Sequence, residues 1–251
     1  MTRPLALLAL LASSALAAPA GAFDIAAMSE AERGAFRAEI RAYLLDNPEV
    51  LMEAIGVLEE RQAAETARAD ESLVADNAAA LFETPGQWVG GNPDGDITMV
   101  EFVDYRCGYC RRAHDDVKEL VSSDGNIRFL LKEFPILGDA STVSSRFALA
   151  TRMVEGDAAY GAVQDALIGL KPAPGEKVLL QLAKSLDLDG KAILSAMENP
   201  EIDRIISENR ALAGAMQING TPTFVIGDEL LRGYVPLDAM RGIVADLRED
   251  G

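Results

Sequence analysis

The stretch that most constrains the fold of this chain is residues 97–121, where an apolar run leads into a pair of cysteines. Residues 97–103 read Ile-Thr-Met-Val-Glu-Phe-Val, a short apolar run that predicts a buried strand. Cys107 and Cys110 follow it and are the only cysteines in the chain, and residues 111–121 have helical periodicity. A C-x-x-C motif at a strand-to-helix junction indicates a redox pair more often than a metal site.

The two cysteines are expected to have different roles. Disulfide exchange needs a thiolate, and Cys107 is expected at the helix start, where unpaired backbone N–H groups and the helix dipole favour negative charge. Arg106 adds a positive neighbour. Cys110, one turn further on and more buried, is the expected resolving thiol. A structural disulfide is the competing interpretation, but a bridge that closes so short a loop would restrict the unfolded chain little.

The first residues have the pattern of an export signal. Arg3 precedes an apolar core at residues 5–12 that is too short to span a bilayer, and small-x-small cleavage options lie within residues 15–22. We therefore predict a signal peptide over residues 1–22, with an uncleaved anchor as the alternative. Export places the cysteine pair where disulfides can persist. Loss of Arg3 changes the formal charge from −17 to −18 (22 bases, 40 acids), which disfavours nucleic acid and anionic membranes as partners.

Residues 24–82 read as helical. Ser29 and Glu32 have the spacing of a capping box, and an Asn-Pro pair at residues 47–48 interrupts the helix. Residues 59–80 are rich in Ala, Glu, Arg and Asp, which suits a solvated helical stalk. The apolar stripes of this part must pack on the main domain or on another copy of themselves, because they are too few to form a core. We favour a self-association segment, and a helical decoration of the main domain is the alternative.

The rest of the chain mixes strand and helix patterns. We predict strands at 87–90, 97–103, 127–132, 223–226 and 229–232, and helices at 111–121, within 141–216 and at 237–247. Gly227 and Asp228 form the expected tight turn between the last two strands. The order predicts an α/β domain over residues 83–251, with one mixed sheet and a helical insertion at about 139–216.

One acidic residue interrupts the apolar strand. Glu101 is either a glutamate on a solvent face or edge strand, or a buried carboxylate that exchanges a proton with Cys110. Lys132, late in the next predicted strand, is a candidate counter-charge for Glu101, and Glu133 is the competing acid there.

A metal site on this chain is disfavoured. His114, the only histidine, could join Cys107 and Cys110 as a third ligand, but structural zinc usually takes four. We therefore expect no metal, and we expect His114 to be a surface residue of the helix.

Several separated motifs resemble a known family. Cys107-Gly108-Tyr109-Cys110 after a buried strand, with Thr221-Pro222 before a late strand, resembles the thioredoxin superfamily. The helical insertion, the run Val-Glu-Phe-Val-Asp-Tyr-Arg-Cys at 100–107 and Phe-Pro-Ile-Leu-Gly at 134–138 are similar to the DsbA family of bacterial thiol–disulfide oxidoreductases. Residues 41–51 resemble the N-terminal segment of ScsC proteins, which are periplasmic DsbA-like relatives linked to copper tolerance.

The resemblance implies a thioredoxin fold with a DsbA-like helical insertion, preceded by an N-terminal helical segment that oligomerises some members. It implies a periplasmic protein whose redox-active disulfide, Cys107–Cys110, serves in place of any cofactor. It also implies that Glu101 is the buried acid and that Thr221-Pro222 forms a cis-proline loop beside the disulfide. The residues expected to contact substrate are Gly108, Tyr109, Thr221 and Pro222.

The residues between the cysteines depart from the pattern of the strong oxidases. Those proteins have proline and histidine there, whereas this chain has Gly108 and Tyr109. Less positive charge near the thiolate predicts a less oxidising couple. Gly108 and Tyr109, with Thr221 before the proline, resemble the dimeric isomerases instead. This resemblance implies an oxidoreductase with an isomerase leaning that acts as a homo-oligomer through residues 24–82. Its expected partners are exported proteins with thiols or disulfides, and a membrane redox partner.

Three other functions stay open. The chain could be a dedicated dithiol oxidase that a membrane partner re-oxidises. It could instead bind Cu(I) through the same cysteine pair, since soft thiolates suit that ion. Finally, it could be an inert scaffold whose cysteines are unreactive.

Overall fold

The computed structural model describes residues 25–250, so the predicted signal peptide at residues 1–22 lies outside the described part. The chain divides into two compact units, one that ends at Glu60 and one that begins at Arg61, and each is described by itself. Within residues 25–250, no helix combines the length and the apolar character needed to cross a bilayer.

The first unit is built from helices. A short 3-10 turn, Ile25–Ala27, precedes α1 (Glu30–Asp46), and α2 (Glu49–Asp76) begins in this unit. The predicted capping box is confirmed: the Glu32 N–H donates to Ser29 Oγ at 3.3 Å, and the Ser29 N–H donates to Glu32 Oε2 at 2.8 Å. The predicted interruption at the Asn-Pro pair is also confirmed, since α1 ends at Asp46 and α2 starts at Glu49.

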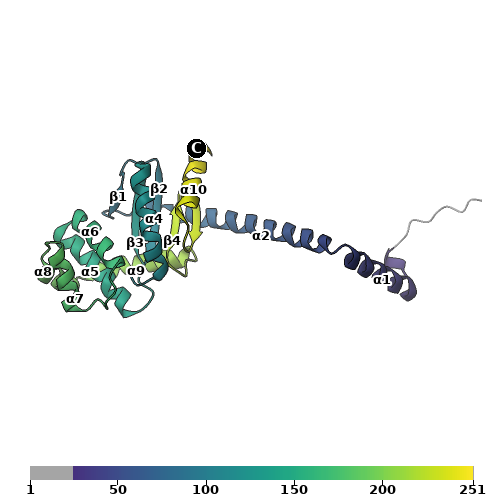
Figure 1. The fold of residues 1–251 in the computed structure, drawn as a ribbon, viewed down its shortest axis with the longest axis horizontal. Helices are drawn as coiled ribbons and strands as arrows, with labels where there is room; N and C mark the ends of the chain where they lie inside the picture. The colour runs from purple at the N-terminus through teal and green to yellow at the C-terminus, as the bar shows by residue number, and fades with distance from the viewer. Residues whose placement is uncertain (1–24, 251) are drawn as a thin grey trace, which may run out of the picture. The chain divides into compact units, whose positions relative to one another are not determined.

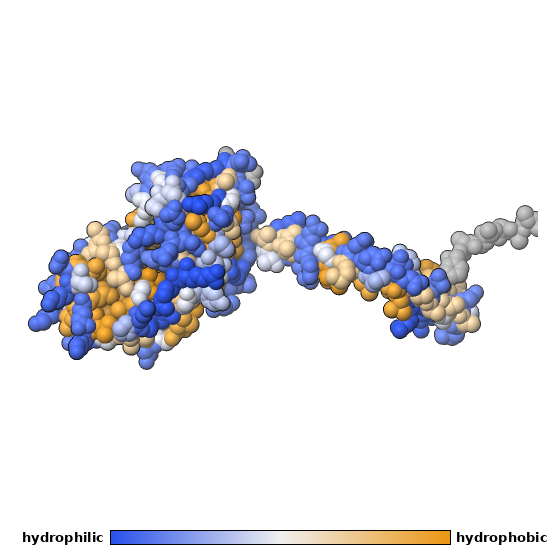
Figure 2. All heavy atoms as spheres, in the orientation of Figure 1, coloured by the Kyte–Doolittle hydropathy of each residue, from blue (hydrophilic) through white to orange (hydrophobic). Residues whose placement is uncertain are grey.

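Apolar side chains of the first unit remain exposed. No residue of α1 is buried, and Figure 2 shows hydrophobic patches along the α1 and α2 helices. These helices therefore form no core of their own within the described residues. The exposed large apolar residues of α1 and the first part of α2 are Phe36, Ile40, Tyr43, Leu45, Leu51, Met52, Ile55, Val57 and Leu58.

The second unit contains a mixed five-stranded sheet in the order β1-β3-β2-β4-β5. Only β2 and β3 pair in parallel, and the other neighbours are antiparallel. The predicted hairpin is confirmed, and Gly227 at its turn has φ +61°, a value that favours glycine. The strands are β1 (Val89–Gly91), β2 (Ile97–Val103), β3 (Ile127–Glu133), β4 (Thr223–Ile226) and β5 (Glu229–Arg232).

Helices cover both faces of this sheet. Figure 1 shows α4 and α10 side by side along the strands and α5 to α8 gathered into a separate group. Together with α9, these four helices make up the predicted helical insertion. This unit also contains α3 and the C-terminal part of α2, and Val74 of α2 and Leu81 of α3 are buried. The remaining helices are α3 (Ala78–Phe82), α4 (Gly108–Asp124), α5 (Asp139–Glu155), α6 (Asp157–Ile168), α7 (Glu176–Ser185), α8 (Gly190–Ala196), α9 (Pro200–Ala215) and α10 (Leu237–Asp250).

The central strand β2 serves two separate cores. Met99 and Val103 pack with α4 and the helical insertion, whereas Val100 and Phe102 pack on the other face with residues of α3 and α9. This division follows from the period of two along a strand. Glu101 has the parity of Met99 and Val103, so it lies on the α4 face, beneath the cysteine helix.

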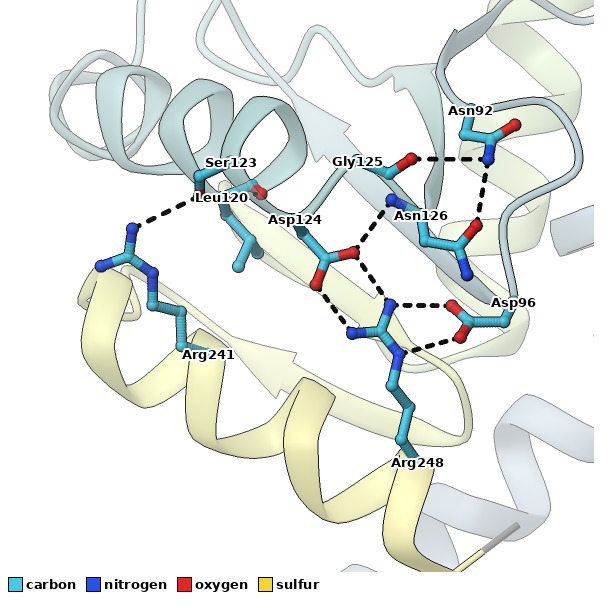
Figure 3. Close-up of polar contacts among 9 residues, drawn as sticks. All are labelled: Asn92, Asp96, Leu120, Ser123, Asp124, Gly125, Asn126, Arg241 and Arg248. Atoms are coloured by element: carbon cyan, nitrogen blue, oxygen red, sulfur yellow. Dashed lines mark hydrogen bonds and ion pairs between the residues drawn. The ribbon is translucent and has the colours of Figure 1, made fainter.

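An arginine clamp holds the end of α10. Figure 3 shows the Arg248 guanidinium between two carboxylates: it donates to Asp96 at 2.8 and 2.9 Å and to Asp124 at 2.7 and 2.8 Å. Hydrogen bonds from Arg248 hold the pKa values of both carboxyls below their ordinary range. The clamp joins α10 to the end of α4 and to the loop before β2.

Candidate active site

The cysteine pair lies at the start of α4. Cys107 is the N-cap residue, and the helix begins at Gly108, earlier than the residue 111 predicted from periodicity. Both cysteines are free thiols and buried; Cys107 is 6% exposed and Cys110 is 1% exposed. The more accessible sulfur is therefore at the helix N-terminus, and the less accessible one lies within the first turn.

The cis-proline loop expected from the family resemblance lies against Cys107. The Cys107 thiol donates a hydrogen bond to the Thr221 carbonyl oxygen at 3.1 Å, and the Thr221–Pro222 peptide bond is cis. The loop is held there because β4 begins at Thr223 and pairs with β2. The sheet thus brings together two segments that lie far apart in the sequence.

Glu101 is buried rather than solvent-facing. Its side chain is 4% exposed and accepts no hydrogen bond from any residue that the structure describes. Burial, and secondarily the charge of Glu133, raise the pKa of Glu101 to about 8. Burial and the charge of Glu101 also raise the pKa of the Cys110 thiol. Glu101 and Cys110 line one cavity.

The predicted pairing of Lys132 with Glu101 is wrong. Lys132 is opposite Phe102 in the β2–β3 register, so it lies on the other face of the sheet. Its ammonium group donates to Ala80 O, Thr84 Oγ1 and Gln87 Oε1 at 2.8 to 3.1 Å. Burial lowers the pKa of Lys132 to about 8. The group that acts on Glu101 is the competing acid, Glu133.

Glu133 joins the turn that precedes Cys107 to the helical insertion. Its Oε1 atom accepts hydrogen bonds from the hydroxyls of Tyr105 at 2.6 Å and Tyr160 at 2.8 Å. Burial raises the pKa of Glu133 to about 7, although the hydrogen bonds from these hydroxyls oppose the shift. Asn209 of α9 donates to the Glu133 backbone carbonyl at 3.0 Å. Sequence reasoning missed Tyr105 and Tyr160, because no local pattern relates them.

Asp104 organises the turn before Cys107 and was also missed. Its buried carboxylate accepts from the Arg106 N–H at 2.8 Å, and from the N–H groups of Ile136 and Leu137 at 2.9 and 3.0 Å. The first of these contacts is an Asx turn, which an aspartate at the end of a strand could have signalled. The other two tie the 134–138 loop to the active-site turn.

Two arginines fix the loop that follows α6. The Arg106 guanidinium donates to the carbonyl oxygens of Leu170, Lys171 and Pro172 at 2.7 to 3.2 Å. Arg111 Nε donates to the Ile168 carbonyl at 2.8 Å. Arg106, which the sequence suggested only as a positive neighbour, therefore also holds part of the insertion beside the cysteine pair.

The other predicted residues lie around the helix start. Tyr109 is 62% exposed, and Gly108 is exposed with open space where a Cβ would be. His114, which we expected to be a surface residue of the helix, is partly exposed on α4. Its ring is half-buried, and Nε2 lies 3.1 Å from Asp165 Oδ1 on α6.

Comparison with known families identifies two regions of the chain. The family described as Thioredoxin matches residues 83–246, and the family described as Copper resistance protein ScsC N-terminal domain matches residues 32–65. The chain also matches sodium/proton antiporters, including NhaA 3 of Salinispora tropica at 27% identity over 65% of this chain. It spans only about a quarter (26%) of that antiporter's length.

Solved structures give the same assignment. A thioredoxin-like oxidoreductase from Silicibacter pomeroyi is 40% identical, with 68% of this chain and 97% of that chain covered and a TM-score of 0.64. The thiol-disulfide exchange protein alpha-DsbA2 from Wolbachia pipientis is 25% identical, with coverage of 73% and 98% and a TM-score of 0.68. Proteus mirabilis ScsC in a transitional conformation is 26% identical, with coverage of 91% and 100% and a TM-score of 0.64. The chain belongs to the thioredoxin family, among its DsbA-like thiol–disulfide oxidoreductases, and carries an N-terminal domain of the ScsC type.

Proposed function

We propose that this protein exchanges thiols and disulfides in exported proteins, with Cys107 as the attacking residue. The observation that carries the proposal is the position of Cys107, at the N-terminus of α4 and against the cis-proline loop. The Cys107 thiolate attacks one sulfur of a substrate disulfide and releases the other sulfur as a thiolate. Cys110 then attacks Cys107 Sγ, which forms the Cys107–Cys110 disulfide and releases the second substrate thiolate. The substrate gains two electrons and the protein loses them; the reverse sequence oxidises a substrate dithiol.

Glu101 is the proposed proton partner of Cys110. The Cys110 thiol must lose its proton before it attacks, and burial raises its pKa. Glu101 lines the same cavity and has a pKa of about 8, so its ionised form is a stronger base than an ordinary glutamate. In its ionised state Glu101 accepts the proton from the Cys110 thiol. In the reverse reaction the Glu101 carboxyl returns this proton to the Cys110 thiolate.

The proposed substrate surface surrounds the exposed start of α4. Gly108 and Tyr109 are open to solvent, and Thr221 and Pro222 form the opposite wall. A loop of this kind offers backbone groups to an extended substrate chain, which can bind by strand addition. Recognition through the backbone would let the protein accept substrates of varied sequence.

An isomerase leaning follows from two features. Gly108 and Tyr109 place no histidine charge between the cysteines, which favours a couple less oxidising than that of the strong oxidases. Isomerisation needs Cys107 in its reduced form. The exposed apolar faces of α1 and α2, within a ScsC-type domain, favour a homo-oligomer through residues 24–82. Several redox sites in one assembly would raise the local concentration of attacking thiols.

The predicted signal at residues 1–22 supports a periplasmic location, where a membrane partner would set the redox state of the cysteine pair.

Activity measurements test this proposal and separate it from its rivals. We expect the mature protein to reduce insulin and to refold scrambled ribonuclease, and we expect Cys107→Ser to abolish both activities. A strongly oxidising potential, with no isomerase activity, would favour the dedicated oxidase. Tight Cu(I) binding without thiol exchange would favour the copper-binding alternative. Unreactive cysteines would favour the inert scaffold.

Sedimentation tests the oligomer. The control is a chain that begins at Arg61, where the second compact unit begins, because Val74 and Leu81 are part of its core. We expect the mature chain to sediment as an oligomer and the shortened chain as a monomer. A monomer in both would remove the basis for the isomerase leaning.

A further inference from the structure

A cavity of about 380 Å³ lies behind the cysteine pair, between α4, α6 and the sheet. Glu101 and Cys110 form part of its wall, and Trp88, Val121 and Phe129 provide apolar surface. The volume lies within the range of roughly 300–1,000 Å³ that is typical of small-molecule sites. The cavity is distinct from the exposed surface around Tyr109, where the protein substrate is proposed to bind.

Glu101 gives the cavity a polar group without a partner. The side chain is 96% buried, and no residue that the structure describes donates to it or accepts from it. Buried polar groups in proteins normally have hydrogen-bond partners, so an unused one calls for an explanation. Its pKa of about 8 keeps the carboxyl protonated near neutral pH, so Glu101 offers an O–H donor toward the cavity.

Gly161 enlarges the cavity at the α6 wall. A glycine in the interior of a helix is destabilising relative to alanine. A Cβ at this position would lie 3.6 Å from the Trp88 ring, an ordinary van der Waals contact, so packing does not require a glycine here. Gly161 and Trp88 both line the cavity, so a larger side chain at position 161 would occupy part of its volume.

The polar atoms of Trp88 in the wall and of Asp165 at the rim have partners within the protein. The indole N–H of Trp88 donates to the Asp157 carbonyl at 3.1 Å, so its ring presents no unpaired polar atom. At the rim, Asp165 lies 2.5 Å from Lys118 Nζ and 3.1 Å from His114 Nε2. The carboxylate thus already has the Lys118 ammonium as a cationic partner, which favours a neutral ligand over a charged one.

We propose that this cavity binds a neutral, largely apolar small molecule that presents a hydrogen-bond acceptor to Glu101. Such a ligand would cover Glu101 and Cys110 from behind while the substrate surface stays open.

The probe for this site is Prodan, a neutral naphthalene with one ketone acceptor and environment-sensitive emission. Trp88 is the only tryptophan in the chain, so energy transfer from it reports a probe in this cavity. We expect saturable one-to-one binding of Prodan to the full mature protein, with transfer from Trp88. Wild-type protein that gives no saturable signal overturns the proposal.

Matched glycine variants locate the site. Gly161→Leu fills the cavity and is expected to weaken Prodan binding at least tenfold. Gly242→Leu, in α10 with open space around its Cβ position, is expected to leave binding unchanged. Equal affinity in the two variants overturns the proposal. Thermal unfolding of each variant establishes that it is folded.

A second variant tests the polar contact and does not depend on Gly161→Leu folding. Glu101→Leu removes the donor but keeps an apolar wall, so we expect weaker binding and a blue shift of the bound probe, whose ketone loses its hydrogen bond. Unchanged affinity and emission would show that Glu101 is not the donor and overturn the proposal. Because the titration does not measure thiol exchange, its failure leaves the proposed function unaffected.

Discussion

The thiol of Cys107 donates to the backbone carbonyl of Thr221 at 3.1 Å, although 114 residues separate them in the sequence. The contact involves the backbone of the loop and not the threonine side chain. Cys110, in contrast, lies against the interior cavity with Glu101. Cys107 is therefore the cysteine whose sulfur contacts the backbone of the cis-proline loop, and Cys110 is the one that lines the cavity.

This difference predicts which cysteine can be trapped. With glutathione disulfide, Cys110→Ser is expected to accumulate a mixed disulfide on Cys107, since the resolving thiol is absent. Cys107→Ser is expected to form little adduct, because Cys110 is only 1% exposed and burial raises its thiol pKa. Intact-mass spectrometry measures both adducts. Greater labelling of Cys107→Ser than of Cys110→Ser would reverse the assigned roles.

Glu101 makes the stability of the reduced protein depend on pH. Its pKa is about 8 in the folded state against an ordinary value of 4.5, so the unfolded state ionises first as pH rises. The free energy of unfolding therefore falls between about pH 4.5 and about pH 8, by up to a few kcal/mol from this group. Glu101→Gln removes this dependence. We therefore expect the free energy of unfolding of the variant to increase relative to that of wild type as pH rises across this window. Urea unfolding at several pH values measures it, and a constant difference would contradict the prediction.

Asp104 is expected to hold the 134–138 loop in place. Asp104→Ala leaves three backbone N–H groups without their acceptor, so we expect a loss of about 2 kcal/mol or more of stability. We also expect the amides of Ile136 and Leu137 to lose protection from hydrogen exchange. Asp115→Ala, at an exposed position of α4, is the control and should change neither quantity. Retained amide protection in Asp104→Ala would show that other contacts hold the loop.

The clamp in Figure 3 predicts an acid-dependent loss of stability. Arg248→Met removes the partner of Asp96 and Asp124, so the thermal midpoint near neutral pH should fall. Both carboxyls have lowered pKa values in the folded state, so their contribution is present above the ordinary value of 3.8 and is lost as pH falls through the folded values. The difference in thermal midpoint between wild type and Arg248→Met should therefore become smaller in acid.

Arg241 on the same helix provides the control for this clamp. It makes longer contacts, with Ser123 Oγ and Glu119 Oε1 both at 3.4 Å, so Arg241→Met should lower the midpoint less. Differential scanning calorimetry at several pH values compares the two variants. Equal effects would mean that Arg248 acts through general surface charge rather than through the two close carboxylates.

Local patterns were sufficient to predict most of the fold. The Ser29 capping box, the buried strand before Cys107 and the turn at Gly227 each depend on neighbours in sequence, and each is present. The boundaries of α4 and β1 differed by a few residues, because helix and strand ends depend on tertiary contacts as well as on periodicity.

The side-chain pairing of the site could not be derived in the same way. The error at Lys132 arose because a shift of one residue in register moves a side chain to the opposite face of the sheet. The role of Asp104 depends on where the 134–138 loop returns, and that of Arg106 on where α6 ends. Such contacts are set by the packing of whole elements.

The carboxyl group of Glu133 bears on how this protein can be re-engineered. It accepts one hydrogen bond from the hydroxyl of Tyr105, two residues before Cys107, and another from that of Tyr160, within the helical insertion. Excising the insertion to make a minimal thioredoxin would remove one of these donors and uncover a carboxyl that is now 1% exposed. The insertion is therefore not a detachable accessory, and recombination between relatives should exchange it together with β3 and the turn that precedes Cys107.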